Sequence, residues 1–301
     1  MTVVEEPKTR NDNEVNSPLK IIEINRINIL SWNISGLESK TGDNDWESYI
    51  FKYEICVFQE TWAVNEVSMN GYTSFHTPAR RSIFGRPSGG LAIWINTCLI
   101  TTVKIIETGS PDLQAITLTR KNNPTILLIN IYNRSTPSNC ESSILSELSN
   151  LIVDYNATHL LIICGDFNLE FEPSFLGSEL TREEDLALGI PGLSIPNITK
   201  LTKAALQVLE ISVSCSLRAV NGRIPPDIER SPTFYRGSYS SNIDYILCDI
   251  RLWGKIKHFE VGKRNDSDHF PLQLSIEGLF AKQGVLQCNP TPENTFITNN
   301  L

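Results

Sequence analysis

Long hydrophobic runs are missing from this 301-residue sequence. The longest apolar runs, such as TILLINIY, are far shorter than the roughly 20 residues that a membrane-spanning helix needs. Residues 1–28 are mostly polar and contain no apolar stretch typical of a signal peptide. We therefore expect an intracellular protein that is not secreted and has no membrane partner.

Paired cysteines are missing as well. The sequence has seven cysteines, an odd number, and no C-x-x-C pair. Cys56, Cys164 and Cys248 lie in apolar runs, where a free thiol behaves as a small hydrophobic side chain. This pattern argues against a zinc site and favours a reducing compartment.

Positive charge is scarce. The sequence carries 26 Lys and Arg against 34 Asp and Glu, which gives a formal net charge of −8. A protein that binds nucleic acid through phosphate contacts alone is expected to be basic, so this balance argues against a simple nucleic-acid clamp. A divalent cation held by acidic residues could still supply positive charge where a phosphate binds.

Short apolar runs separated by turn residues predict many short strands with a few helices between them. We expect strands at residues 20–35, 54–61, 89–95, 114–120, 125–132, 159–168, 231–236, 243–249, 258–262 and 271–278. We expect helices at 45–53, 141–155 and 198–212, and a loop with a short helix at 170–197. This mixture favours helix-covered sheets in one domain over residues 26–278. Residues 1–25 and 279–301 are expected to be flexible.

Polar side chains stand at the ends or starts of several predicted strands. In LIICGDFNLE an apolar strand stops at Asp166 and Asn168, which project to the same face if the chain there is extended. Other strands carry Asn33, Glu60, Tyr132, Asp244, Asp268 and His269 in comparable places. Each residue alone has an ordinary explanation as a turn residue, a solvated strand end or a core side chain. Their joint occurrence favours one site on one rim of the sheets.

A set of motifs in this order resembles the endonuclease/exonuclease/phosphatase superfamily, the metal-dependent hydrolases related to DNase I and to abasic-site endonucleases. The motifs are SWNISGL, FQET, NIYN, GDFN, NIDYIL and SDHFPL, and they span residues 31–272. The resemblance implies an α/β fold, a four-layered α/β sandwich of two packed mixed β-sheets flanked by helices. The run from NGRIPPD to SDHFPL is similar to the C-terminal half of endonuclease domains from non-LTR retrotransposons.

The resemblance also implies roles for the rim residues. Glu60, with help from Asn33 or Asp268, would hold Mg²⁺ or Mn²⁺, which both prefer oxygen ligands. The implied catalytic residues are Tyr132, Asp166, Asn168, Asp244 and His269. Asp166 would orient or deprotonate the attacking water, and Asp244 would fix the tautomer of His269 and raise its pKa. Whether Asp166 or His269 is the general base stays open at this point.

One motif departs from the family, and other residues are candidate DNA contacts. Many members have Y-x-P-N where this chain has Tyr132 followed directly by Asn133, so Asn133 is left out of the catalytic set. TFYRGSYSSN predicts a hairpin that turns at Gly237, and similar endonucleases insert that hairpin into DNA. The candidate DNA contacts are Thr233, Arg236 and Tyr239 on this hairpin, and Arg80, Arg81 and Arg86 before residue 89. Solvated loops would explain the same residues.

The first functional hypothesis is a Mg²⁺-dependent endonuclease of retrotransposon type that nicks double-stranded DNA, with a reverse transcriptase of the same element as a partner and the nucleus as its place of action. An alternative is a phosphatase or phosphodiesterase of the same fold that acts on a phosphoinositide, a phospholipid or a nucleotide. A third reading is a catalytically inactive, domesticated domain that only binds a partner. Target sequence, abasic-site preference and oligomeric state stay open, as does whether the chain is a full protein, a truncated copy or a fragment of a polyprotein.

Overall fold

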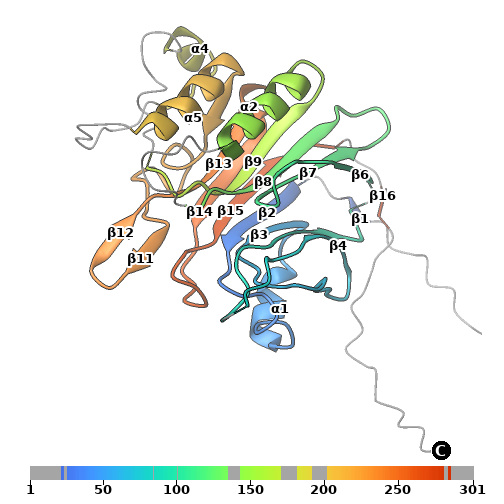
Figure 1. The fold of residues 1–301 in the computed structure, drawn as a ribbon. Helices are drawn as coiled ribbons and strands as arrows, with labels where there is room; N and C mark the ends of the chain where they lie inside the picture. The colour runs from blue at the N-terminus through green and yellow to red at the C-terminus, as the bar shows by residue number, and fades with distance from the viewer. Residues whose placement is uncertain are drawn as a thin grey trace, which may run out of the picture.

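The structure is a computed structural model that describes residues 22–23, 26–83, 85–99, 101–134, 143–170, 182–191, 202–280 and 284–285. Two six-stranded mixed sheets dominate it (Figure 1). The first sheet has the order β14 (Ile256–Val261), β15 (Leu272–Glu277), β2 (Arg26–Asn33), β3 (Ile55–Gln59), β5 (Leu91–Asn96) and β4 (Tyr72–Thr77). The second has the order β10 (Leu217–Ala219), β13 (Asp244–Asp249), β9 (Leu160–Asp166), β8 (Ile126–Tyr132), β7 (Leu113–Thr119) and β6 (Thr102–Ile106).

The two sheets pack face to face around an aliphatic core. One cluster of buried side chains joins them, with Ile29 and Val57 from the first sheet and Leu128, Ile162 and Ile246 from the second. The central pairs β2–β3 and β8–β9 are parallel, whereas their neighbours are antiparallel. Strands buried on both faces explain the continuous apolar runs in the sequence.

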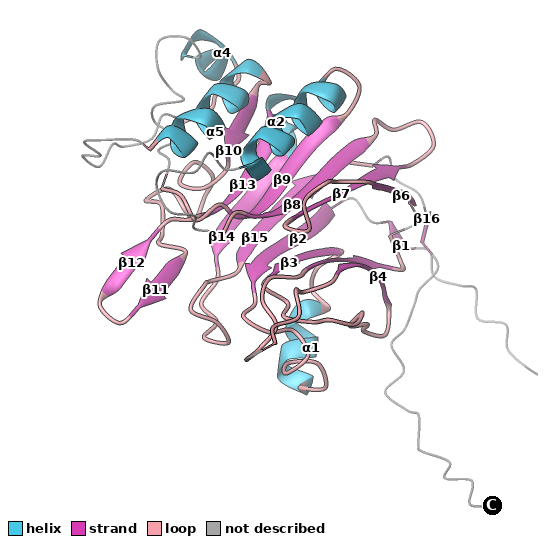
Figure 2. Ribbon diagram, viewed as in Figure 1, coloured by secondary structure: helices cyan, strands magenta, loops and turns pink. Residues whose placement is uncertain are grey.

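Helices cover the outer faces of both sheets (Figure 2). The apolar sides of α2 (Ser143–Asn156) and α5 (Lys203–Ser214) pack on the second sheet. The short α1 (Asn44–Ile50), capped by Asp43, places Trp46 against Phe58 and Trp94 of the first sheet. The predicted four-layered α/β sandwich is therefore confirmed. No helix among the described residues is both long and apolar enough to span a membrane.

Smaller elements complete the fold. A hairpin of β11 (Phe234–Arg236) and β12 (Tyr239–Ser241) projects from the sandwich and turns at Gly237, as predicted (Figure 1). The predicted loop 170–197 contains α4 (Arg182–Ala187), which is held by Asp185 to the buried Arg218 at 2.7 Å. A 3₁₀ helix (Ile250–Lys255) follows β13.

Some strands of the structure were not predicted, and two short strands lie in segments that were predicted to be flexible. The edge strands β4 and β6 and the short β10 were not predicted, because the exposed positions of the two edge strands interrupt their apolar pattern. Residues predicted to be flexible include β1 (Ile22–Glu23) and β16 (Gly284–Val285), which pair with each other. Nearly all other residues of the two predicted flexible segments lie outside the described part of the chain.

Candidate active site

Strand ends from both sheets meet at one rim of the sandwich. In the second sheet, Tyr132, Asp166 and Asp244 lie side by side, because the registers of β8–β9 and β9–β13 pair them. In the first sheet, Asn33 ends β2 and pairs with Gln59, the residue before Glu60. The sheet registers alone therefore bring these distant parts of the sequence together.

Hydrogen bonds join the rim side chains into one group. Asn33 Nδ2 donates to Asp166 Oδ2 at 3.0 Å and to Glu60 Oε1 at 3.3 Å. The His269 ring lies between two carboxylates, with Nδ1 2.9 Å from Asp244 Oδ2 and Nε2 3.8 Å from Asp166 Oδ2. All except Glu60 are buried. We call Asn33, Glu60, Asp166, Asp244 and His269 the rim cluster.

The GDFN motif places Asp166 through its backbone. Gly165 has a φ of +147°, and a Cβ there would lie 2.0 Å from the carbonyl oxygen of Ile131, so a side chain does not fit. Asn168 has a φ of 48° and turns back, so that its backbone N and its Nδ2 donate to Asp166 at 2.8 and 3.1 Å. The prediction of an extended chain from Asp166 to Asn168 is wrong, although the two side chains do meet.

Glu60 stands on strained backbone. Both Glu60 and Trp62 adopt left-handed conformations, with φ values of 49° and 51°, which cost on the order of 1 kcal/mol each for residues other than glycine. Trp62 Nε1 donates to Glu60 Oε2 at 2.9 Å, while Asn33 donates to the other carboxylate oxygen. This local fold holds the Glu60 carboxylate at the wall of a cleft.

Burial and charge change the proton affinities of the rim cluster. Burial, and next the neighbouring Asp244, raise the pKa of Asp166 to about 8, although His269 opposes the shift. Burial alone would lower the pKa of His269, but Asp244 and Asp166 outweigh it and raise that pKa to about 9. The pKa of Tyr132 is also raised, mainly by burial and next by the Glu60 carboxylate. His269 is therefore a cation at neutral pH.

The donor set fits a hard divalent cation. Asn33 Oδ1 is buried and has no hydrogen-bond partner among the described residues, although its own Nδ2 is used. This orphaned oxygen belongs to the same group as the carboxylate of Glu60, and Asp268 lines the same cleft. An uncompensated buried oxygen beside carboxylates is the environment that Mg²⁺ or Mn²⁺ satisfies.

A second set of candidate ligands is less suited to a metal. Asp166, Asp244 and His269 offer atoms within 4.8 Å of one another. However, His269 Nδ1 is bonded to Asp244, and Asp244 Oδ2 also accepts from Thr233 Oγ1 at 2.7 Å. These bonds use His269 Nδ1 and Asp244 Oδ2 to orient the imidazole, so the triad favours proton placement over metal binding.

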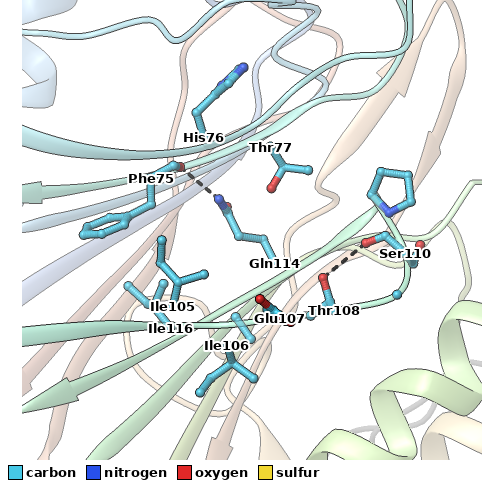
Figure 3. Close-up of a pocket in the computed structure, with 13 residues that line it drawn as sticks. Phe75, His76, Thr77, Ile105, Ile106, Glu107, Thr108, Ser110, Gln114 and Ile116 are labelled. Atoms are coloured by element: carbon cyan, nitrogen blue, oxygen red, sulfur yellow. Dashed lines mark hydrogen bonds between the residues drawn. The ribbon is translucent and has the colours of Figure 1, made fainter.

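The rim opens into a cleft of about 630 Å³. It is lined by Ser35, Glu60, Trp62, Arg86, Ser88, Gly89, Tyr132, Arg134, Arg236, Asp268 and His269. A smaller cavity of about 380 Å³ lies between the edge strands β4 and β6 (Figure 3). There Gln114 donates to the Phe75 carbonyl, and the His76 ring lies on the other side of β4. None of the predicted site residues lines this smaller cavity.

The structure separates the predicted DNA contacts. Arg236 lines the cleft and binds Asp268 at 3.1 Å, and Tyr239 is 60% exposed on the hairpin. Arg81 is exposed but does not line the cleft, and Arg80 is bound to both carboxylate oxygens of Asp112.

Thr233 is fully buried and has no surface for DNA. Its hydroxyl donates to Asp244 and accepts from the backbone N–H groups of Ile243 and Asp244, each at 3.1 Å. Thr233 was expected to contact DNA, but in the structure it supports Asp244 of the rim cluster instead.

Sequence reasoning missed two cleft residues that adjoin the motifs. Trp62 follows FQET directly, and Arg134 follows Asn133 in NIYNR. Asn133 itself is buried and donates to the Phe167 carbonyl at 2.7 Å, away from the cleft, which agrees with its omission from the catalytic set. Adjacency to a motif was the only signal for Trp62 and Arg134 in the sequence.

Comparison with known proteins gives one family and a set of similar folds. The model of the endonuclease/exonuclease/phosphatase family matches residues 30–269. No curated protein sequence matches this chain.

Several solved structures share the fold at low identity. The endonuclease domain of TRAS1, a telomere-specific non-LTR retrotransposon, has a TM-score of 0.57 and 17% identity, covering 85% of this chain and 100% of that one. The catalytic domain of Xenopus laevis APE2 has a TM-score of 0.62 and 18% identity, with coverages of 87% and 94%. The 3' phosphatase NExo from Neisseria, bound to a product DNA hairpin, has a TM-score of 0.58 and 15% identity, with coverages of 83% and 99%. At these identities the likeness describes the fold.

Proposed function

Because the chain belongs to the endonuclease/exonuclease/phosphatase family, we propose that it is a divalent-metal-dependent endonuclease that nicks double-stranded DNA. Family membership supports a hydrolase that acts on phosphodiester bonds. The observation that carries the finer proposal is the rim cluster, of which Glu60 and His269 line a cleft whose walls also hold Arg86, Arg134 and Arg236. Carboxylates and an imidazole suit phosphoryl chemistry, and guanidinium groups suit the phosphates of a strand.

Asn33, Glu60 and Asp268 would hold Mg²⁺ or Mn²⁺. The orphaned Asn33 Oδ1 and the carboxylates near it support this assignment. A divalent cation bound there would neutralise charge that develops on the phosphate oxygens.

The protonation states divide the remaining roles. His269 is a cation at neutral pH, which suits a hydrogen bond to a negatively charged phosphate oxygen and not the removal of a proton from water. Asp166, ionised once a divalent cation bound nearby lowers its pKa from about 8, would orient the water and accept its proton, with Asn168 fixing the carboxylate by two hydrogen bonds. Asp244 holds His269 through Nδ1, which leaves Nε2 directed toward Asp166. Tyr132, on the cleft wall, would donate to the phosphate or to the leaving oxygen.

DNA is the substrate that the surroundings of the site favour. The protein has a net charge of −8, so it needs local positive charge to hold a polyanion, and the cleft supplies it. The projecting β11–β12 hairpin begins at the site, since Phe234 forms a β-bridge to His269 and Arg236 binds Asp268. This hairpin, together with the likeness to the TRAS1 domain, supports an endonuclease of retrotransposon type, acting in the nucleus with a reverse transcriptase of the same element.

Nicking of supercoiled plasmid tests the proposal. Purified protein is incubated with Mg²⁺ or with EDTA, beside Asp166→Ala and the exposed control Asp154→Ala. We expect relaxation that requires Mg²⁺, persists in Asp154→Ala and disappears in Asp166→Ala. Relaxation that Asp166→Ala retains would overturn the site assignment. Wild-type protein that leaves the plasmid intact but hydrolyses a phosphomonoester or a phospholipid would overturn the endonuclease and favour a phosphatase.

A further inference from the structure

The arginines that line the cleft differ in how their charge is balanced. Arg134 binds Asp112 at 3.1 Å, and Arg236 binds Asp268 at 3.1 Å. Arg86 forms no ion pair with any residue in the described part of the chain, although it lies in an acidic protein. Its positive charge is therefore available to an anion that enters the cleft.

A rigid aromatic platform supports Arg86. Its guanidinium carbon lies 3.8 Å from the centre of the Trp62 ring. The Trp62 ring packs against Gly36, where a Cβ would come within 2.8 Å of Trp62 Cε3. The Trp62 backbone N–H donates to the Gly89 carbonyl at 2.9 Å, and its indole N–H donates to Glu60. Trp62 is thus fixed by its backbone, by close packing and by a side-chain hydrogen bond.

The loop that carries Arg86 is closed at its base. Arg80 and Ser88 exchange two backbone hydrogen bonds, at 3.0 and 3.1 Å. Arg80 is also anchored to Asp112 through its side chain. The closed loop therefore holds the Arg86 side chain over the Trp62 ring.

Stacking leaves the hydrogen-bonding edge of a guanidinium free. Arginine binds an aromatic ring through its flat face and a phosphate through the N–H groups at its edge, so one arginine can do both. Glu60 is bonded to one edge of the Trp62 indole, whereas Arg86 lies over the ring face. Arg86 is thus held by Trp62 and not by the rim cluster, in a place where it could bind a phosphate other than the one that reacts.

We propose that Arg86, stacked on Trp62, is a binding subsite for a non-reacting phosphate of a nucleic-acid backbone. This proposal rests on the proposed function as a DNA nuclease, and it adds a specific contact between Arg86 and the DNA backbone. It also makes Trp62 a positioning residue for Arg86 and Glu60.

Salt dependence of DNA binding tests the contact directly. A labelled duplex oligonucleotide is titrated with wild-type protein, Arg86→Ala and Lys104→Ala in EDTA at several KCl concentrations, with fluorescence anisotropy as the readout. Lys104 is exposed on the edge strand β6, so Lys104→Ala matches the change in net charge away from the cleft. Loss of one phosphate contact makes the slope of log K against log salt less negative by about 0.9. We expect this change in Arg86→Ala only, with weaker binding at low salt.

Tryptophan fluorescence tests the stack itself. The protein has five tryptophans, and only Trp62 is partly exposed, since Trp32, Trp46, Trp94 and Trp253 are buried. Acrylamide should quench the emission of Arg86→Ala more strongly than that of the wild type, because the Trp62 ring face becomes uncovered. Trp62→Phe should abolish this difference, and bound duplex should protect Trp62 in the wild type.

The outcomes separate this subsite from the proposed function. Equal slopes for Arg86→Ala and Lys104→Ala would overturn the subsite, even if the wild type nicks plasmid. Wild-type protein with no duplex binding up to about 10⁻⁴ M, the weak limit of non-specific DNA binding, would overturn it as well. A slope change in Arg86→Ala without any plasmid nicking would support the subsite and reject the nuclease.

Discussion

Two of the buried polar groups among the described residues are built differently. One is a ladder of neutral amides between the sheets, made of Gln59, Asn130 and Gln114 and here called the amide ladder. The other is the rim cluster, which contains two buried carboxylates and a charged imidazole. The amide ladder consists of strand residues, whereas Glu60 and His269 of the rim cluster lie just outside strands, and Gln59 stands next to Glu60 in the sequence.

Most polar atoms of the amide ladder have partners, although Gln59 Oε1, like Asn33 Oδ1, has none among the described residues. Gln59 Nε2 donates to Asn130 Oδ1 at 2.8 Å, and Asn130 Nδ2 donates to the Phe58 carbonyl at 3.0 Å. Gln114 Nε2 donates across to the Phe75 carbonyl at 2.9 Å. Neutral amides cost little to bury once they are paired, and they do not titrate. The ladder therefore sets how the two sheets face each other.

The rim cluster differs from the ladder because it contains ionisable side chains. Asn33 Oδ1 lacks a partner among the described residues, and burial raises the pKa of Asp166 far above its usual value. Buried charge without full compensation is unfavourable for folding, whereas a metal and a phosphate would complete it. In these two groups, the neutral amides serve structure and the charged rim cluster serves the proposed chemistry, whereas the buried ion pair of Arg218 and Asp185 is both charged and structural.

The largest change in activity is expected at Asp166, where a substitution should lower the activity without lowering the stability. We expect Asp166→Asn to lower kcat/KM by about 10³-fold, because it removes the proton acceptor, while Tm stays unchanged or rises, because burial already disfavours an ionised carboxylate at this position. Nicking rates and thermal unfolding, with the exposed Asp154→Asn as control, check both parts. A lower Tm with retained activity would make Asp166 a structural residue like those of the amide ladder.

The opposite result is expected in the amide ladder. Asn130→Ala leaves Gln59 Nε2 and backbone carbonyls without their partner, so the free energy of unfolding should fall by about 2–3 kcal/mol. Denaturant unfolding measures this loss, and the exposed Asn65→Ala provides the control. The nicking rate per folded molecule should change less than about twofold, since no bond to the rim cluster is lost. A large loss of rate without loss of stability would contradict the comparison.

A smaller effect concerns the proton on His269. Asp244 raises the pKa of His269 to about 9, so the imidazolium persists below that pH and is lost as the pH rises through it. Asp244→Asn should lower the pKa, and the alkaline limb of the kcat/KM profile should move down by about one pH unit or more. Rates between pH 6 and pH 10 would show the shift. An alkaline limb at the same pH in both proteins would mean that His269 does not act as a cation.

The smallest expected change in rate concerns Thr233, and it tests whether Thr233 supports Asp244 or contacts DNA. Thr233→Val removes the hydroxyl that bonds Asp244, so kcat should fall by about fivefold, whereas Thr233→Ser keeps the hydroxyl and the rate. Duplex affinity, measured by anisotropy, should be the same in both variants, because Thr233 is buried. Weaker duplex binding by Thr233→Val alone would restore its predicted role as a DNA contact.

Sequence patterns were sufficient to place residues wherever a polar side chain ends the apolar run of a strand. Apolar runs that stop at an acid or an amide predicted the positions of Asp166 and Asn33, because a buried strand must end where polar groups begin. The order of the motifs then predicted the sandwich and the meeting of strand ends at one rim. The hairpin that turns at Gly237 was predictable because the turn requires a positive φ.

Other features depend on contacts that no local pattern encodes. Asn168 turns back because its amide groups find Asp166, which an extended strand would not allow. Thr233 is buried by its packing around Asp244, and an isolated TFYR sequence shows no sign of this. The pairing of Arg80 with Asp112 and the stacking of Arg86 on Trp62 also join distant segments. Which arginine keeps a free charge could therefore be read only from the structure.

The pairing of β1 with β16 has a consequence for protein engineering. Ile22 and Val285 lie on adjacent antiparallel strands, so the chain enters and leaves the sandwich about 5 Å apart. A domain with adjoining entry and exit points can be grafted into a surface loop of another protein, or closed into a ring and reopened elsewhere, without stretching its core. In Figure 1 this pair lies on the opposite side of the sandwich from the β11–β12 hairpin. A host protein joined there would leave the hairpin free to reach its substrate.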